Sequence, residues 1–362
     1  MDLIKTIDSY IHTGVPIFSD YIFNCNKKSI FSSNWNYRKL LHIKGSSGAD
    51  VGYQVLLKVG ESSTASNYDF HLDGNSKKFP NNKNQSGDLR FTNSSETVPL
   101  NFWVEKVEGT VPNRTAYVWV KIEDNLDNDV DIYCYYGNNK ADNVSNGDNT
   151  FSLFDDFEGT VIDASKWTVE TRKYGSWGGA GRAELDGNSS LHLVGNMYFS
   201  TGSGNVISIM KVTNGFSVQI KRKYTNYHYV HFSFGSGGFG PLSPHSALGW
   251  AYPVLDNGYS FGQTNTSVSF ITEVPENHLI SSNFWGNFNV FETVNFVYTK
   301  DGDIKWIHNG IEKLSTTSTK YLTNLKRLMI SQGSDDYGHA PHQYVDYVLV
   351  RKYVSPEPHF IS

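Results

Sequence analysis

Two carboxylates that lie close together in the sequence, Glu184 and Asp186, are the side chains best spaced for acid–base chemistry. A retaining glycosidase needs two carboxylates about 5 to 5.5 Å apart, and alternate residues of a strand, which share a face, can supply them. The segment from Glu184 follows the pattern Glu-x-Asp-x-x-Glu except at its last position, where Ser189 cannot protonate a leaving group. Gly187 and Asn188 favour a turn. Hydrolysis is therefore disfavoured, and a pair of acids distant in sequence stays open as its route.

Nucleophilic and redox chemistry have less support. The chain contains no Gly-x-Ser-x-Gly nucleophile elbow, and no reactive-thiol context surrounds its two cysteines, Cys25 and Cys134. Two thiols this far apart in sequence define neither a disulfide framework nor a zinc site. A bridge and two free thiols both stay open.

Side chains suited to hold a sugar gather in three glycine-rich loops of the C-terminal half. A saccharide stacks the C–H face of its ring on an aromatic side chain, while its hydroxyls bond to polar partners. Glycine-rich turns lie at the surface, so large aromatic residues in them are candidates for this contact. Packing over the edge of the domain is the alternative at each position. The predicted ligand-binding residues are Trp177 and Arg182 in the first loop, His245, Trp250, Tyr252, Asp256 and Asn257 in the second, and Trp285 in the third.

Composition limits the classes of fold and partner. The 362 residues suggest two domains, and 22 Tyr, 22 Phe and 32 Gly suit short strands joined by tight turns. The net charge is −5, and no cationic run exceeds Lys221–Lys223, so nucleic acid is excluded as an expected partner. No stretch approaches 18 apolar residues, so no membrane span is expected.

Short strands must position the candidate residues. Between residues 32 and 150, turn clusters separate strand-like runs every 8 to 12 residues, which predicts a β-sandwich. The polar stretch 137–150 fits a linker or a loop at the edge of a domain, and residues 73–88 fit a loop. The predicted strands here are 37–43, 53–59, 89–91, 100–107, 116–122 and 130–136.

A second β-rich region, residues 151–362, predicts a two-sheet jelly roll. An Asn-Gly pair at residues 309–310 between apolar residues predicts a hairpin. The predicted fold class is therefore all-β, with two antiparallel β-sandwiches. The predicted strands are 206–212, 216–222, 229–234, 268–271, 291–299, 304–308, 327–331 and 345–353.

The first 31 residues predict a short helical extension. Leu3, Ile4, Ile7 and Ile11 fall on one helical face, and charged residues interrupt the apolar run, so no signal peptide is recognisable. A helix this short needs a partner surface. It either folds back on its own domain or anchors residues 1–31 to another subunit, as in a homo-oligomer or a larger assembly.

Two family resemblances add to this interpretation. Residues 34–39, 88–92, 116–121 and 132–138 resemble a domain-of-unknown-function family of archaeal and bacterial surface proteins, often fused to a concanavalin A-like jelly roll. Family members usually begin with a secretion signal. The second region, through residues 154–159 and 345–353, is similar to the concanavalin A-like, laminin G-like jelly roll. That resemblance implies glycan binding, adhesion or, in some relatives, glycoside hydrolysis, and a fold alone does not choose among them.

The second resemblance also implies a structural calcium ion. Such relatives often bind Ca²⁺ where their opening and closing strands meet, and Asp156, Glu158 and Asp346 are the oxygen donors at these strands. The alternative is that these acids cap turns or pair with Arg351 and Lys352. A further set of possible metal ligands is expected to lie in a surface loop, because no third nitrogen or sulfur ligand occurs at a zinc spacing. Its members are Asp335, Asp336, His339 and His342.

The leading hypothesis is a non-catalytic recognition or adhesion protein whose jelly roll binds a cell-surface glycan or glycoprotein. With no recognisable signal peptide, we expect a virion or tail-fibre receptor-binding component, or a cell-surface adhesin whose leader has been removed. Either location is an extracellular surface or a virion. The alternatives are a glycan-cleaving hydrolase and an architectural shell or surface-layer subunit without a ligand.

Overall fold

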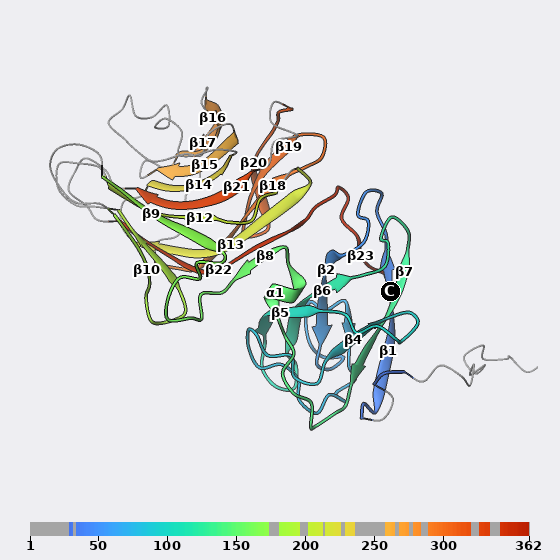
Figure 1. Ribbon diagram of the computed structural model, residues 1–362. Coiled ribbons are helices and arrows are strands. Elements are labelled where there is room, and N and C mark those ends of the chain that lie inside the picture. Colours follow the sequence, from blue (N-terminus) through green and yellow to red (C-terminus); the bar gives the residue numbers. More distant parts are fainter. Residues whose placement is uncertain are drawn as a thin grey trace, which may run out of the picture.

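The computed structural model describes residues 29–31, 34–173, 181–195, 202–212, 214–225, 229–235, 258–264, 268–274, 278–283, 289–319, 326–333 and 341–361. Its strands form four sheets that make two β-sandwiches, which confirms the predicted all-β class (Figure 1). The helix α1 (Gly147–Thr150) is a single turn. Within the described part of the chain, no helix has the length and apolar character needed to cross a bilayer.

Two four-stranded sheets form the first sandwich, with strand orders β23-β1-β7-β4 and β3-β2-β6-β5. Apolar residues alternate along the strands, and Leu41, Ile43, Leu57 and Val118 are fully buried between the sheets. Its strands are β1 (Tyr37–Lys44), β2 (Tyr53–Gly60), β3 (Phe70–His71), β4 (Arg90–Asn93), β5 (Phe102–Glu108), β6 (Thr115–Ile122), β7 (Val130–Tyr136) and β23 (His359–Ile361).

The C-terminal strand belongs to this first sandwich. β23 pairs with β1, with Phe360 opposite Ile43, and Val354 is buried in the first core. Because β23 covers the outer edge of β1, it protects a strand edge that would otherwise be open. Residues 151–362 were expected to form the second domain, and no local feature of the sequence indicates this return of the chain.

The second sandwich has an eight-stranded and a seven-stranded sheet. The first follows the order β10-β11-β22-β13-β18-β19-β20, with β8 beside β22, and the other follows β17-β16-β15-β14-β21-β12-β9. The eight-stranded sheet contains β8 (Leu153–Asp155), β10 (Arg182–Leu185), β11 (Leu191–Val194), β13 (Phe216–Thr225), β18 (Glu292–Tyr298), β19 (Asp303–His308), β20 (Ile311–Thr317) and β22 (His342–Lys352). The seven-stranded sheet contains β9 (Trp167–Lys173), β12 (Gly202–Ser208), β14 (Tyr229–Gly235), β15 (Gly258–Thr264), β16 (Val268–Val274), β17 (His278–Asn283) and β21 (Arg327–Gly333).

The predicted hairpin is confirmed. Asn309 and Gly310 join β19 to β20 with φ of 46° and 79°. Two successive positive φ angles are what a two-residue hairpin turn requires, and Asn and Gly are the residues that adopt them most readily.

The predicted linker is held against the first sandwich. The buried carboxylate of Asp88 accepts hydrogen bonds from the backbone N–H groups of Lys77 (2.7 Å), Gly137 (2.9 Å) and Asn138 (3.1 Å). The side chain of Asn146 then caps α1 by accepting from the backbone N–H of Asn149 (2.9 Å). Residues 137–150 therefore lead into the second sandwich along a fixed path.

Of the N-terminal extension, only its last residues are described. The hydroxyls of Ser29 and Tyr135 are 2.7 Å apart, and the Phe31 ring packs on the rings of Trp35 and Tyr135. Cys134 is a buried free thiol, and burial raises its pKa. Cys25 and the predicted helix lie outside the described residues.

Candidate functional site

The first sandwich stands on the outer face of the eight-stranded sheet (Figure 1). An irregularity in β22 shapes this contact: Lys221 of β13 is opposite Tyr347, whereas its neighbour Arg222 is opposite Val345. Asp346 is thus the extra residue of a β-bulge, which redirects side chains. Both Asp346 and Tyr347 consequently reach towards the first sandwich.

An aromatic cluster fills the junction between the two sandwiches. Trp103 lies edge-to-face with Tyr347 (centroids 5.2 Å apart) and with Phe154 (4.9 Å), and all three side chains are buried. Such pairs contribute about 0.5–1.5 kcal/mol each beyond the burial of area. The cluster consists of Trp103, Trp119, Phe151, Phe154, Tyr347 and Leu349.

The carboxylate of Glu105 organises the polar border of this cluster. Its Oε2 accepts a hydrogen bond from the indole N–H of Trp119 (2.7 Å). Its Oε1 accepts from the Tyr347 hydroxyl (2.7 Å) and from the Gln219 amide (2.9 Å). Burial and the adjacent carboxylate raise the pKa of Tyr347 well above its usual value, so this hydroxyl stays protonated as a donor.

Beside this network lies a cleft of about 560 Å³ between the sandwiches, here called the junction cleft. Leu56 and Trp119 line it from the first sandwich, and the amides of Gln219, Asn295 and Asn309 line it from the second. Gln219 is oriented by its neighbour, since its Oε1 accepts from the Asn295 amide (3.2 Å). The cleft therefore combines apolar surface with amides whose positions are fixed. Its remaining lining residues are Gln54, Glu105, Lys106, Tyr117, Thr293, Gly310, Arg351, Glu357, Pro358 and His359.

Arg351 forms one end of the junction cleft. Its guanidinium carbon lies 4.8 Å from the centroid of the Trp119 ring, and its Nη1 and Nη2 both bond to the carboxylate of Glu357. Glu357 also accepts from the hydroxyl of Tyr53 (2.9 Å). The two acids of the cleft, Glu105 and Glu357, are thus both engaged by partners from both sandwiches.

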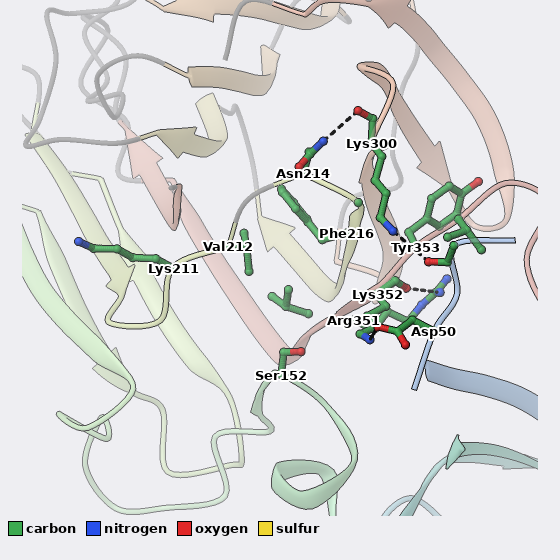
Figure 2. A pocket seen from close by; sticks show the side chains of 14 residues that line it. Asp50, Ser152, Lys211, Val212, Asn214, Phe216, Lys300, Arg351, Lys352 and Tyr353 are labelled. Atoms are coloured by element: carbon green, nitrogen blue, oxygen red, sulfur yellow. Dashed lines mark hydrogen bonds and ion pairs between the residues drawn. The ribbon is translucent and has the colours of Figure 1, made fainter. Parts of the chain in front are cut away.

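A second crevice, of about 390 Å³, opens elsewhere along the junction (Figure 2). Its cations serve as links: the ammonium of Lys300 donates to the carbonyl of Gly48 (3.0 Å), and that of Lys352 donates to the carbonyl of Val51 (2.5 Å). Asn214 donates to the carbonyl of Lys300 (2.9 Å), while Lys211 points away. This crevice is where the turn at residues 48–51 is attached to the second sandwich.

The turn predicted after Glu184 is confirmed. β10 ends at Leu185, and the Asp186 carboxylate accepts from the backbone N–H groups of Asn188 (2.8 Å) and Ser190 (3.0 Å). Glu184 instead faces His192, whose Nδ1 lies 3.4 Å from its Oε1. The two acids have different local roles and do not form a pair along one strand.

The three predicted calcium ligands make contacts of another kind. Asp346 lies between two ammonium groups, those of Lys83 (2.7 Å) and Lys221 (2.8 Å). Burial alone would raise its pKa, but the hydrogen bonds from these lysines outweigh burial and hold it below the usual value. Asp156 accepts from the amide of Asn84 (2.5 Å), and Glu158 accepts from the hydroxyl of Ser189 (2.6 Å).

As these side chains are placed, they do not fit a calcium ion. No group of three His, Cys, Asp or Glu side chains suited to a metal occurs among the described residues. The alternative of ion pairs applies to Asp346 and to Glu158, which lies 3.6 Å from the Lys83 ammonium, but the partners are Lys83 and Lys221 in place of Arg351 and Lys352. Calcium binding stays a prediction.

Of the eight predicted ligand-binding residues, the structure describes Arg182, an exposed residue of β10. The other seven lie outside the described residues and stay predictions: Trp177, His245, Trp250, Tyr252, Asp256, Asn257 and Trp285. Among the set expected to be a surface loop, His342 was misplaced, since it begins β22 and forms a hydrogen bond with His192 (2.7 Å).

Sequence reasoning missed the junction cleft. A signal was present in β6, where Tyr117 and Trp119 alternate with the fully buried Ala116, Val118 and Val120. Two large aromatic rings on the face of a strand opposite its core need a second surface to cover them. The sequence did not identify that surface as β13, β18 and β22, because strands distant along the chain supply it.

Comparisons with known proteins agree with these features only in part. Residues 85–170 match a family model described as "Domain of unknown function (DUF2341)". The matched stretch runs from the loop before β4 into β9, so it includes the chain that links the sandwiches. No curated protein matches the chain.

The chain is also similar to solved structures of glycan-cleaving proteins. One is described by the words "Prominent members of the human gut microbiota express endo-acting O-glycanases to initiate mucin breakdown" (13% identity, 56% of this chain, 100% of the other, TM-score 0.42). Another is a β-1,3-glucanase from Mycobacterium marinum (12% identity, 55% of this chain, 98% of the other, TM-score 0.41). A third is a glycoside hydrolase family 16 endo-glucanase from Bacteroides ovatus (13% identity, 55% of this chain, 99% of the other, TM-score 0.40). These similarities are distant. The second sandwich is therefore described as a jelly roll from the strand order of its own eight-stranded and seven-stranded sheets.

Proposed function

We propose that this protein binds glycans without cleaving them and that the junction cleft is a saccharide-binding site. The observation that carries the proposal is the composition of the cleft wall, with Trp119 and Leu56 on one side and the amides of Gln219, Asn295 and Asn309 on the other. A volume of about 560 Å³ is within the range of small-molecule sites, which occur preferentially between domains. The half-buried Leu56 offers apolar surface to the C–H face of a sugar, and the amides of Asn295 and Asn309, which are not fully buried, can donate to and accept from its hydroxyls.

The hydrogen bonds of the two cleft carboxylates favour recognition over hydrolysis. A general acid must exchange its proton with the substrate and therefore needs a free oxygen aimed at it. Glu105 already accepts from three side chains, and Glu357 accepts from Arg351 and Tyr53. Sustained release of reducing ends from a polysaccharide, abolished by Glu105→Gln or by Glu184→Gln, would establish the hydrolase alternative instead.

A glycan array followed by titration calorimetry tests the proposal. Asn295→Ala combined with Asn309→Gly removes two amides from the cleft, and glycine keeps the positive φ of residue 309. Loss of two neutral hydrogen bonds is expected to weaken binding about tenfold. Asn188→Ala, an exposed asparagine on the turn after β10, is the matched control and should bind as the unaltered protein does.

The predicted loop residues provide a second arm of the same experiment. Trp250→Ala and Trp285→Ala test the proposal that the rim of the jelly roll also contacts the glycan. If only these variants lose binding, the site lies in the loops and the cleft proposal is wrong. Repeating the array with a calcium chelator tests the calcium prediction, and the absence of any glycan ligand would favour an architectural subunit.

A more specific proposal concerns where the glycan is found and what the protein is attached to. We propose that the glycan is on a cell surface and that the protein is an adhesin or a virion or tail-fibre component, attached to its assembly through residues 1–31. The amphipathic spacing of Leu3, Ile4, Ile7 and Ile11 supports an anchor. Contacts of Ser29 and Phe31 with Tyr135 support it as well, because they attach the end of the anchor to the first sandwich.

A further inference from the structure

Beyond the junction cleft, the outer face of the eight-stranded sheet carries a row of stacked rings and a cation. The ring of His192 stacks on that of Tyr344 (4.5 Å between centroids, 1° between planes) and on that of His342 (5.0 Å, 12°). The ammonium of Lys223 lies 4.8 Å from the centroid of Tyr344 and 4.9 Å from that of Phe291. We call these five residues the ring row.

The ring row continues the surface of the cleft. Along β13, Gln219, Lys221 and Lys223 alternate on the outer face, and Gln219 lines the cleft. The adjacent β18 contributes Thr293 to the cleft, and Phe291 comes two residues earlier. At a rise of about 3.3 Å per residue, Lys223 lies roughly 13 Å along β13 from Gln219. One extended molecule leaving the cleft in this direction would pass over the ring row.

Charge on this face is not balanced. Two acids near the row already have cationic partners: Glu184 lies 3.8 Å from the Arg182 guanidinium, and Asp346 lies between the ammonium groups of Lys83 and Lys221. Lys223 makes no ion pair with any carboxylate in the described part of the chain, and two aromatic faces surround its ammonium. An ammonium held in this way attracts an anionic group, while the neighbouring rings accept the C–H face of a sugar.

We propose that the ring row is a subsite for a sugar that bears a carboxylate or a sulfate, within a glycan chain whose neighbouring units occupy the junction cleft. The proposal rests on the proposed function and adds the chemical class of its ligand, an acidic polysaccharide. Lys223 supplies the charge that selects the anion. Tyr344, Phe291 and His192 supply the platform.

Binding of three polysaccharides tests this subsite: polygalacturonate for carboxylate, dextran sulfate for sulfate, and dextran as the neutral reference. The unaltered protein should prefer at least one acidic polymer to dextran. Lys223→Gln should weaken binding of that polymer about tenfold, the effect of losing one charge-assisted hydrogen bond, with dextran binding unchanged. Lys223→Arg keeps the charge and should retain most of the binding. Lys140→Gln removes the same charge from an exposed position elsewhere and should have no effect.

The outcomes separate this inference from the proposal on which it rests. If the cleft variants weaken glycan binding but Lys223→Gln behaves as Lys140→Gln does, the subsite is wrong and the cleft stands. If the unaltered protein binds neither these polymers nor any glycan of the array, the proposed function is wrong. Binding of a single-stranded oligonucleotide as tight as that of the acidic polymer would show a general affinity for polyanions and overturn the subsite.

Discussion

Glu105 illustrates how a single carboxylate can connect two domains. Three donors converge on it, one from the first sandwich and two from the second, and each of them is buried. A buried donor without an acceptor costs about 1–3 kcal/mol. Glu105 therefore fixes Trp119, Gln219 and Tyr347 relative to one another, and with them the wall of the junction cleft.

Replacement of Glu105 should accordingly destabilise the protein. Glu105→Ala leaves the indole N–H of Trp119, the Tyr347 hydroxyl and the Gln219 amide without their acceptor. We expect the free energy of unfolding to fall by at least about 2 kcal/mol, measured by urea denaturation. Glu123→Ala, directly after β6, removes an exposed ion pair with Lys121 and should cost less than about 1 kcal/mol. Equal effects of the two changes would contradict the assigned role.

The pair of histidines in the ring row should make stability depend on pH. Burial is the largest cause that lowers the pKa of each histidine. His342 lowers the pKa of His192 further, and Arg182 lowers that of His342 further. Glu184 acts in the opposite direction on both histidines, and Asp186 does so on His192. Because the folded state disfavours the imidazolium, this contribution to stability is complete above a pH of about 6.5 and decreases as the pH falls below it. The free energy of unfolding should drop between pH 7 and pH 5, and less steeply in His342→Gln. Identical slopes in the two proteins would refute the pairing.

At the scale of the elements, an irregular strand makes the junction possible. Residues 345, 348 and 350 of β22 point into the jelly-roll core, so a regular alternation could not also place Asp346 and Tyr347 together on the outer face. The bulge at Asp346 resolves this conflict. The predicted strand 345–353 overlaps most of β22, which runs from His342 to Lys352, but alternation could not reveal the bulge, whose position is set by the pairing with β13.

The hairpin between β19 and β20 was predictable because its signal is local. Gly310 adopts a φ of 79°, and a Cβ at this position would meet no atom within 4 Å. Gly310→Ala should therefore cost about 1–2 kcal/mol from backbone strain alone, read as a lower urea midpoint with an unchanged denaturant slope. Gly159→Ala, at an exposed glycine without a positive φ, is the control. If Gly310→Ala leaves the urea midpoint unchanged, the turn relaxes to accommodate alanine and the expected strain is absent.

At the scale of the whole molecule, the two sandwiches are joined by chain crossings at residues 151–153 and 353–358, and by the aromatic cluster between them. The sequence predicted both β-sandwiches from alternation and turn spacing, which are local properties. It did not predict the pairing of β23 with β1, the contact of Arg351 with the Trp119 ring, or the ion pairs of Asp346 with Lys83 and Lys221. Each of these depends on residues more than 70 positions apart, and one sequence carries no local signal of such pairings.

The joined sandwiches should unfold together. Differential scanning calorimetry should show one cooperative transition for the unaltered protein. Trp103→Ala empties the centre of the aromatic cluster and should cost about 3–5 kcal/mol. We expect that variant to unfold in two steps, one for each sandwich. Two separate transitions in the unaltered protein would contradict a rigid junction.

The N-terminal extension should determine the assembly state. Size-exclusion chromatography with light scattering on the full chain and on a variant lacking residues 1–28 should give an oligomer and a monomer, respectively. The shorter chain keeps the contacts of Ser29 and Phe31 with Tyr135, so its first sandwich should remain intact. Monomers in both cases would rule out the anchor.

The central claim is that the junction cleft, formed only when the two sandwiches pack together, holds a saccharide. Its most direct test is the dissociation constant of one array-selected glycan, measured by titration calorimetry for the unaltered protein and for the variant with Asn295→Ala and Asn309→Gly. The account predicts binding about tenfold weaker in the variant, measured well below the unfolding midpoint of both proteins, because the variant also loses the hydrogen bonds that Asn295 donates to Gln219 and that Asn309 accepts from the backbone N–H of Thr293. Equal dissociation constants for the two proteins would contradict it.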